Sequence, residues 1–197
     1  MLDTALREEL LRMEAEDRDL HTELSQTGEI FRYSYHPRLA ALHLEHGQRL
    51  EQLIETHGWP GRSIAGEDGA HAAWFVLQHA IGLPALQRRA LPLLRDAAAR
   101  GDASRPAPAY LEDRIAFNER RPQRYGTQFD WDANGEMSPW TLAEPERVEE
   151  LRASVGLGSL EERVAQIRSG TLPEHRPPDL ARYRAEQAAW ARSVGWL

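Results

Sequence analysis

The longest stretch of the chain without an Arg, Asp or Glu residue is residues 69–87. The chain has no Lys at all, so this stretch carries no charge beyond that of a protonated His. Its apolar residues recur at the spacing of an α-helix, which predicts a helix over about residues 66–81 that ends before Gly82 and Pro84. Interspersed His and Gln residues argue against a membrane span. We therefore expect a buried helix at the centre of a soluble fold.

Helical patterns also lie on both sides of this stretch. Periodic apolar residues define each of them, and Gly or Pro residues mark most of their ends. The predicted helices cover residues 2–24, 37–57, 84–100, 106–121 and 179–194. The β-favouring residues Tyr125, Thr127, Phe129 and Trp131 alternate with other side chains, and Asn134-Gly135 is typical of a tight hairpin turn. The predicted fold is mainly α: a compact multi-helix bundle with one small β-hairpin near residues 125–140.

The length of 197 residues suits one domain, which we expect to span residues 1–197. The N-terminal helix (2–24) and the C-terminal helix (179–194) are expected to pack on the central part of this domain. No targeting segment is visible, so a cytoplasmic location is predicted. A net charge of -7 argues against nucleic-acid binding. The sequence leaves the oligomeric state open.

The composition excludes whole classes of chemistry. Without Cys the chain has no disulfide, no thiol nucleophile and no Cys-ligated metal. Without Lys it has neither a Schiff-base residue nor the phosphate-binding lysine of a P-loop. Reactions must therefore use His, carboxylate, hydroxyl or Arg side chains, or a metal held by nitrogen and oxygen ligands. No cofactor is predicted.

The central helix should nevertheless carry a polar stripe. At about 100° per residue, His71, Gln78 and His79 fall on one side, and Asp68 lies on that side in the first turn. One interpretation is functional: the stripe lines a cleft. The other is structural: buried His and Gln side chains bond to the backbone or to other helices, and Asp68 favours the helix N-terminus.

His43 and His46 are three residues apart and share a face of their predicted helix. With Asp68 and either His71 or His79, they would form a nitrogen and oxygen ligand set suited to zinc or iron. No HExxH or Glu-x-x-His motif supports such a site. The sequence therefore predicts no metal, and His43 and His46 are only weak candidates.

Two polar segments lie in the second half of the chain. Asp113-Arg114 falls within a predicted helix, and the sequence Gln-Arg-Tyr-Gly-Thr-Gln follows at residues 123–128. The structural interpretation of the second segment is a loop that caps the bundle. The functional interpretation is a wall that presents its glutamines and its tyrosine to the cleft.

Several of these segments occur together in a fixed order: Gly58-Trp59-Pro60, Gln78-His79, Asp113-Arg114 and residues 123–128. With them, residues 35–165 or thereabouts resemble a family of uncharacterised bacterial proteins that is described only as a domain of unknown function. The resemblance implies that the segments belong to one unit, and it implies no activity, cofactor or catalytic residue. His46 departs from the family, which has Asn at that place, and this argues against a metal pair with His43.

The first functional hypothesis is an enzyme that acts on a small molecule by hydrolase- or lyase-type acid–base chemistry. His79 would carry the proton, Asp113 would hold its ring, and His71 is the third expected catalytic residue. The residues expected to bind the substrate are Trp59, Asp68, Gln78, Arg114, Gln123, Arg124, Tyr125 and Gln128. The alternative is a non-catalytic ligand-binding or protein-interaction module in which these polar residues are structural.

Overall fold

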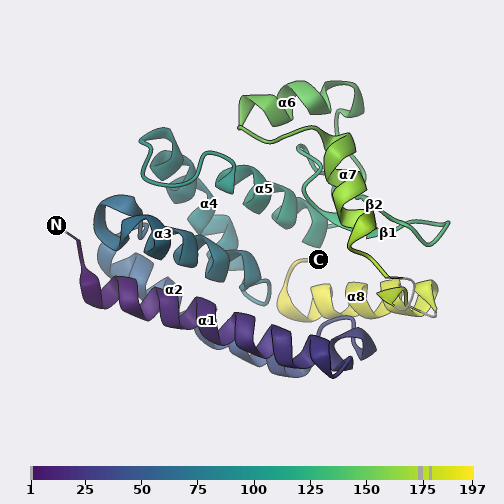
Figure 1. Ribbon diagram of the computed structural model, residues 1–197, viewed down its shortest axis with the longest axis horizontal. Helices are drawn as coiled ribbons and strands as arrows, with labels where there is room; N and C mark the ends of the chain where they lie inside the picture. The colour runs from purple at the N-terminus through teal and green to yellow at the C-terminus, as the bar shows by residue number, and fades with distance from the viewer. Residues whose placement is uncertain (1, 173–174, 178) are drawn as a thin grey trace. The chain divides into compact units, whose positions relative to one another are not determined.

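The computed structural model describes residues 2–172, 175–177 and 179–197 (Figure 1). The structure is 67% helical, and its described residues form eight α-helices and one small two-stranded antiparallel sheet. The predicted mainly α fold with a single small hairpin is therefore confirmed. Contacts within the chain divide it into two compact units, Met1–Ala107 and Pro108–Leu197.

The first unit is built from helices around α3. Its elements are α1 (Thr4–Gln26), η1 (Glu29–Arg32), α2 (Pro37–His57), α3 (Arg62–His79) and α4 (Pro84–Ala99). Both α1 and α2 pack against α3 (Figure 1). The buried residues of α3 are mostly small, which lets the neighbouring helices approach it closely. The uncharged stretch of the sequence thus becomes the centre of this unit, as expected.

Helix α3 differs from its prediction at both ends. It begins at Arg62, before the expected start, but Gly66 interrupts it with backbone angles of φ 75° and ψ 175°. The regular helix therefore starts after Gly66, where the sequence placed it, and it ends at His79. Within the part of the chain that the structure describes, no helix combines the length and the apolar character that crossing a bilayer requires.

The turn between α2 and α3 is held by Asp102, which follows α4. The backbone N–H of Ser63 donates to the Asp102 carboxylate (2.6 Å), and the N–H of Arg62 donates to the Asp102 carbonyl oxygen (2.8 Å). A side chain on Gly61 would overlap the Asp102 carboxylate. The Gly-Trp-Pro-Gly sequence is therefore explained by the packing of this turn, and Trp59 lies buried within it.

The second unit combines short helices with the hairpin. Its elements are α5 (Ala107–Asn118), β1 (Phe129–Trp131), β2 (Met137–Pro139), η2 (Pro145–Arg147), α6 (Val148–Ser154), α7 (Leu160–Ser169) and α8 (Leu180–Val194). The strands pair with Phe129 opposite Pro139 and Trp131 opposite Met137. A small apolar core gathers Ala109, Tyr125 and Leu151. The hairpin is shorter than the sequence indicated, because the amides of the preceding segment bond to a side chain of α5 instead of to a strand.

Two glycines set the distances between the helices of the first unit. A Cβ atom on Gly69 of α3 would lie 3.0 Å from the Ala65 Cβ and 3.2 Å from the Arg7 Cγ of α1. A Cβ atom on Gly47 of α2 would lie 2.8 Å from the Ala80 Cβ, just after α3. Gly47 is one helical turn after His43, so this close approach brings His43 next to the end of α3.

Replacing Gly47 by Ala tests this packing. The added methyl group has no room beside Ala80, and we expect a loss of about 1–3 kcal/mol of unfolding free energy. Gly82→Ala is the matched control, because a Cβ there meets nothing within 4 Å. Urea unfolding of the two variants measures the difference. Equal stability of both variants would contradict the close approach of α2 to the end of α3.

Candidate functional site

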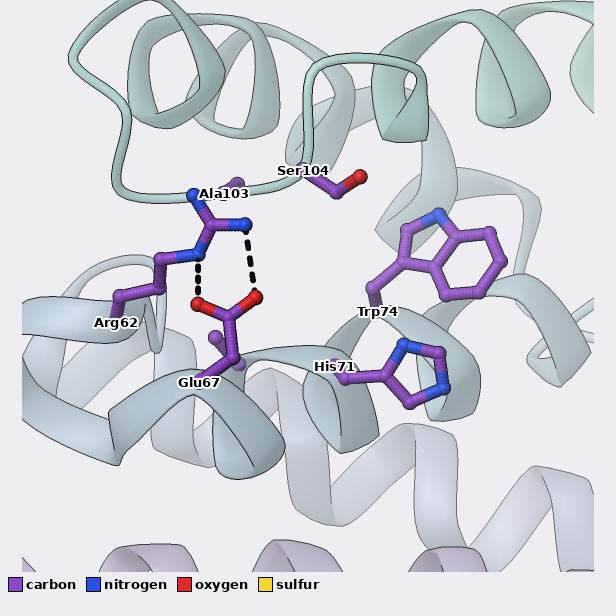
Figure 2. Close-up of a pocket in the computed structure, with 7 residues that line it drawn as sticks. Arg62, Glu67, His71, Trp74, Ala103 and Ser104 are labelled. Atoms are coloured by element: carbon purple, nitrogen blue, oxygen red, sulfur yellow. Dashed lines mark hydrogen bonds and ion pairs between the residues drawn. The ribbon is translucent and has the colours of Figure 1, made fainter. Parts of the chain in front are cut away.

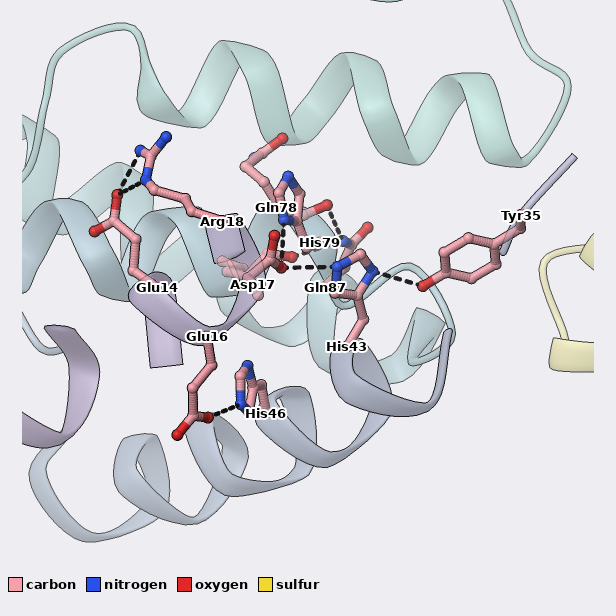
Figure 3. Close-up of polar contacts among 11 residues, drawn as sticks. Glu14, Glu16, Asp17, Arg18, Tyr35, His43, His46, Gln78, His79 and Gln87 are labelled. Carbon is pink, nitrogen blue, oxygen red and sulfur yellow. Dashed lines mark hydrogen bonds and ion pairs between the residues drawn. The ribbon is translucent and has the colours of Figure 1, made fainter. Parts of the chain in front are cut away.

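Three helices of the first unit each contribute one polar side chain to a common point (Figure 3). Asp17 comes from α1, His43 from α2 and His79 from the last position of α3. The Asp17 Oδ2 atom lies 2.8 Å from His79 Nδ1 and 2.7 Å from His43 Nε2. One candidate ligand atom from each residue lies within 4.8 Å of the other two. We call these three residues the Asp17–His43–His79 centre.

The two imidazole contacts of Asp17 differ in direction. The contact with His79 Nδ1 has the geometry of a hydrogen bond. His43 Nε2 is as close, but among the described residues it has no hydrogen bond of acceptable angle. The ring of His43 is instead fixed through its other nitrogen, because Nδ1 lies 2.8 Å from the Tyr35 hydroxyl oxygen. The His43 Nε2 and Asp17 Oδ2 atoms are therefore close together, but the His43 ring is not aligned for a hydrogen bond to the carboxylate.

The centre is mostly closed to solvent. The side chain of Asp17 is 4% exposed and that of His43 is 9% exposed, whereas His79 is 30% exposed. The His79 ring packs edge-on against Phe75, with ring centroids 4.2 Å apart. The guanidinium of Arg18 lies over the other ring of this pair, 4.5 Å from the Phe75 centroid. Of the three residues, His79 is the one that molecules in solution can reach most easily.

The electrostatics keep Asp17 ionised. Burial alone would raise the pKa of this carboxyl group, but the contacts with His43 and His79 outweigh burial. The net result is a pKa well below the usual range for Asp. The centre is therefore a buried, ionised carboxylate in contact with two imidazole rings.

Asp17 and Tyr35 were not among the candidates from sequence, although Asp17 left a recognisable pattern. The buried positions of α1 are Leu6, Leu10, Met13, Asp17 and Leu24. Asp17 thus occupies a core position of an amphipathic helix, where an ionised side chain is rare unless it is paired. Such a carboxylate within an apolar stripe marks a buried polar site, but it does not reveal the partners.

The residues of the predicted polar stripe have different surroundings in the structure. The side chain of His71 is 53% exposed and lies 3.6 Å from a Glu14 oxygen. It lines a pocket of about 110 Å³ with Arg62, Glu67 and Trp74, and neither Gln78 nor His79 is part of that lining (Figure 2).

Gln78 and Asp68 take different places in the first unit. Gln78 is buried, and neither atom of its amide has a hydrogen-bond partner among the described residues. Asp68 forms an ion pair with Arg7, and this hydrogen bond lowers the pKa of Asp68. Its role is therefore to join α3 to α1.

The weak metal candidates are also separated. His46 is buried and bonds through Nε2 to Glu16 (3.0 Å), away from the centre. His43 meets His79 and Asp17 instead of His46 and Asp68. The His43-x-x-His46 spacing thus singled out one member of the centre, His43, although His43 and His46 do not meet at a common point.

Asp113 has a role other than the one expected for it, since Asp17 is the carboxylate that contacts His79. Asp113 is fully buried, and it accepts hydrogen bonds from the backbone N–H groups of Arg124 (2.8 Å), Tyr125 (3.0 Å) and Thr127 (2.9 Å). Burial raises the pKa of Asp113, and these hydrogen bonds oppose that rise. The Asp113 side chain is therefore the anchor of the segment that follows α5.

The remaining polar residues of this segment mostly serve the same loop. Gln123 is fully buried, and its side-chain amide donates to the backbone carbonyl oxygens of Gln128 and Trp140, while its side-chain oxygen Oε1 accepts from the Gln128 N–H. Tyr125 belongs to the apolar core of the second unit. Arg124 is exposed and lies over the Tyr125 ring. Arg114 is half-buried on α5. For Gln123, Tyr125 and Gln128, the loop interpretation accounts for the contacts seen.

The chain belongs to a family whose model is described as a family of unknown function (DUF6624), which matches residues 4–170. The match begins well before the segment that carried the resemblance, and it includes all of the Asp17–His43–His79 centre. Neither a search of curated proteins nor a search of solved structures finds a match.

The anchoring role of Asp113 predicts a large effect of its removal. Asp113→Ala leaves three backbone N–H groups of the loop without their acceptor, and we expect a loss of about 3–5 kcal/mol of unfolding free energy. Thr127→Val is the matched control, since it keeps Asp113 and removes only the two hydrogen bonds of the Thr127 hydroxyl, which donates to Asp113 and accepts from the Gln128 amide. Each of these should contribute about 0.5–1.5 kcal/mol. Urea unfolding measures both. If the two variants were equally stable, Asp113 would not be the anchor.

The lowered pKa of Asp17 predicts an acid-sensitive contribution to stability. An unfolded Asp has a pKa of about 3.9, so the stabilisation from Asp17 is present above about pH 4 and is lost as the pH falls toward the folded-state pKa. The difference in unfolding free energy between the wild type and Asp17→Asn should therefore shrink below about pH 4. Urea titrations from pH 7 downward test this. A difference that is independent of pH would contradict the ionised, paired state of Asp17.

Proposed function

We propose that this member of a family of unknown function is an enzyme that acts on a small molecule by hydrolase- or lyase-type acid–base chemistry at the Asp17–His43–His79 centre. The observation that carries the proposal is a single buried carboxylate oxygen within 2.8 Å of imidazole nitrogens from two different helices. A cytoplasmic location and a small-molecule partner, with no nucleic acid, belong to the same proposal.

The chemistry of the centre suits proton transfer. A carboxylate that bonds to one nitrogen of an imidazole orients the ring and stabilises its protonated form. Asp17 is nearly inaccessible, whereas His79 is 30% exposed, so the orienting group is shielded and the ring can meet a substrate. Because the chain has neither Cys nor Lys, imidazole and carboxylate groups are its main resources for acid–base catalysis.

Gln78 supports a binding role beside the centre. It directly precedes His79, and its buried amide lacks a hydrogen-bond partner among the described residues. An unpaired buried amide costs about 1–3 kcal/mol. A substrate group that both donates and accepts hydrogen bonds would recover that cost, so we assign Gln78 to substrate binding. No residue of the second unit is needed for this proposal.

A structural role is the second candidate for the centre. Asp17, His43 and His79 each belong to a different helix, so their contacts also tie α1, α2 and α3 together. Buried ionic groups are, however, weak stabilisers, and apolar side chains of similar volume often serve as well or better. The ends of these helices also have their own caps and glycines, so the fold has other means of positioning them.

An unbiased substrate search separates the two candidates. The purified protein is incubated with a small-molecule extract of cells, and mass spectrometry records which compounds are consumed. We expect the wild type to convert at least one compound, and His79→Gln to slow that conversion by about 100-fold or more. His46→Gln is the matched control, because His46 is a buried, carboxylate-paired histidine outside the centre.

Two outcomes would contradict an enzymatic role. One is a wild-type protein that consumes no compound from the extract. The other is a conversion that His79→Gln and His46→Gln slow to the same extent, because the effect would then follow from a loss of stability. Thermal unfolding of all three proteins is measured alongside to recognise the second case.

A further inference from the structure

We infer that the Asp17–His43–His79 centre binds a divalent transition-metal ion, with Asp17 Oδ2, His43 Nε2 and His79 Nδ1 as its ligands. The inference concerns the residues of the proposed function but goes beyond it, since it requires no reaction. It rests on the positions of these three atoms and on the state of the His43 ring.

The ligand atoms are spaced nearly as an ion would need them. Ions of the zinc type bind nitrogen and carboxylate oxygen at about 2.0–2.2 Å, so neighbouring ligands of one ion lie about 3.0–3.4 Å apart. The two contacts of Asp17 Oδ2 measure 2.7 and 2.8 Å, and each of the three residues offers one ligand atom within 4.8 Å of those of the other two. Opening the centre by a few tenths of an ångström, as estimated from those bond lengths, would seat an ion between them.

The His43 ring gives an independent indication. Its Nε2 atom belongs to a side chain that is nine-tenths buried, and it has no hydrogen bond among the described residues although a carboxylate oxygen is 2.7 Å away. Two ligands of one ion lie close together in this way, because both point at the ion and not at each other. The contact of His43 Nε2 with the carboxylate is therefore close but not a well-aligned hydrogen bond, and an ion between the two atoms would satisfy both.

Tyr35 completes the surroundings expected of a metal ligand. Metal-binding histidines usually hydrogen-bond through the nitrogen that does not hold the metal, which fixes the ring and its tautomer. His43 Nδ1 lies 2.8 Å from the Tyr35 hydroxyl oxygen, and a ring that donates from Nδ1 to this oxygen presents an unprotonated Nε2 to an ion. Tyr35 is therefore a positioning residue for the site.

The donor set also indicates which ions fit. Two imidazoles and one carboxylate suit zinc, iron and similar transition ions, whereas magnesium and calcium prefer ligand sets made of oxygen alone. Three protein ligands leave at least one coordination position open, as in catalytic metal sites and unlike closed structural ones. In the reaction that we propose, water on such an open position would then take over proton transfer from the His79 ring.

Metal binding by the full-length chain tests the inference. The protein is stripped with a chelator, dialysed against Zn²⁺, Mn²⁺ or Mg²⁺, and analysed for bound metal by mass spectrometry, with calorimetric titration of Zn²⁺ for affinity. We expect one equivalent of Zn²⁺ per chain, Mn²⁺ bound more weakly and no Mg²⁺. His43→Gln and His79→Gln should each weaken Zn²⁺ binding by about 100-fold or more, and Tyr35→Phe by about 10-fold or more.

Matched histidine variants control for adventitious binding. His46→Gln removes a buried histidine outside the centre, and His71→Gln removes an exposed one. Both should keep the Zn²⁺ affinity within about threefold of the wild type, as sites outside the first and second coordination spheres do. Absorption of the Co²⁺-substituted wild type provides a readout that needs no variant to fold: it should show ligand-field bands of a low-symmetry site.

The inference fails if the wild type takes up no stoichiometric Zn²⁺, or if the centre variants bind it as tightly as the two controls. These outcomes are distinguishable from failure of the proposed function. Metal uptake without turnover of any compound leaves the metal site standing and removes the enzyme. If the chelator-treated protein binds no stoichiometric metal but still converts a compound in a reaction that requires His79, the enzyme stands and the metal site does not.

Discussion

A negative charge held between two imidazoles is the constraint on which the functional account of this molecule depends. Asp17 occupies a core position of α1, where an isolated carboxylate would be strongly unfavourable. His43 and His79 make the burial tolerable, and their contacts keep the carboxylate ionised. Since each of the three side chains comes from a different helix, the centre can exist only when α1, α2 and α3 are in place together.

Small residues make that arrangement possible. Gly69 lets α1 approach α3, and Gly47 lets α2 approach the residues just after α3. His79 is the last residue of α3, so the end of the helix that the sequence made central also carries the most accessible side chain of the centre. The rest of the first unit positions the helices, as Asp102 does for the turn before α3.

The sequence predicted the local structure better than the site because helical periodicity is a local property. The central helix, its neighbours and the short hairpin follow from apolar spacing and from Gly and Pro breaks. The partner of His79 is a long-range property, and the sequence offers several carboxylates without ranking them. Asp113 was the expected partner, but it bonds to backbone amides 11 to 14 residues further along the chain.

The difference between local periodicity and long-range contacts also explains why the other predicted site residues lie apart. His71 and His79 lie on one side of an ideal helix, yet only His79 contacts Asp17, while His71 lines a separate pocket and lies near Glu14. The polar segment at residues 123–128 is conspicuous in sequence because its side chains hold a loop together. Asp17 was the informative residue that the patterns did offer, as a charged group within the apolar stripe of α1.

The central claim is that Asp17, His43 and His79 act as one centre, and a titration of the histidine ring nitrogens by ¹⁵N NMR tests it most directly. Zn²⁺ is added in steps to the stripped wild-type protein while long-range spectra resolve each ring. The account predicts that the ¹⁵N signals of His43 Nε2 and His79 Nδ1 shift together and stop changing at one equivalent of Zn²⁺. The ring signals of His46 should not change. Shifts that arise first at other histidines, or that affect His43 and His79 at different equivalents, would contradict it.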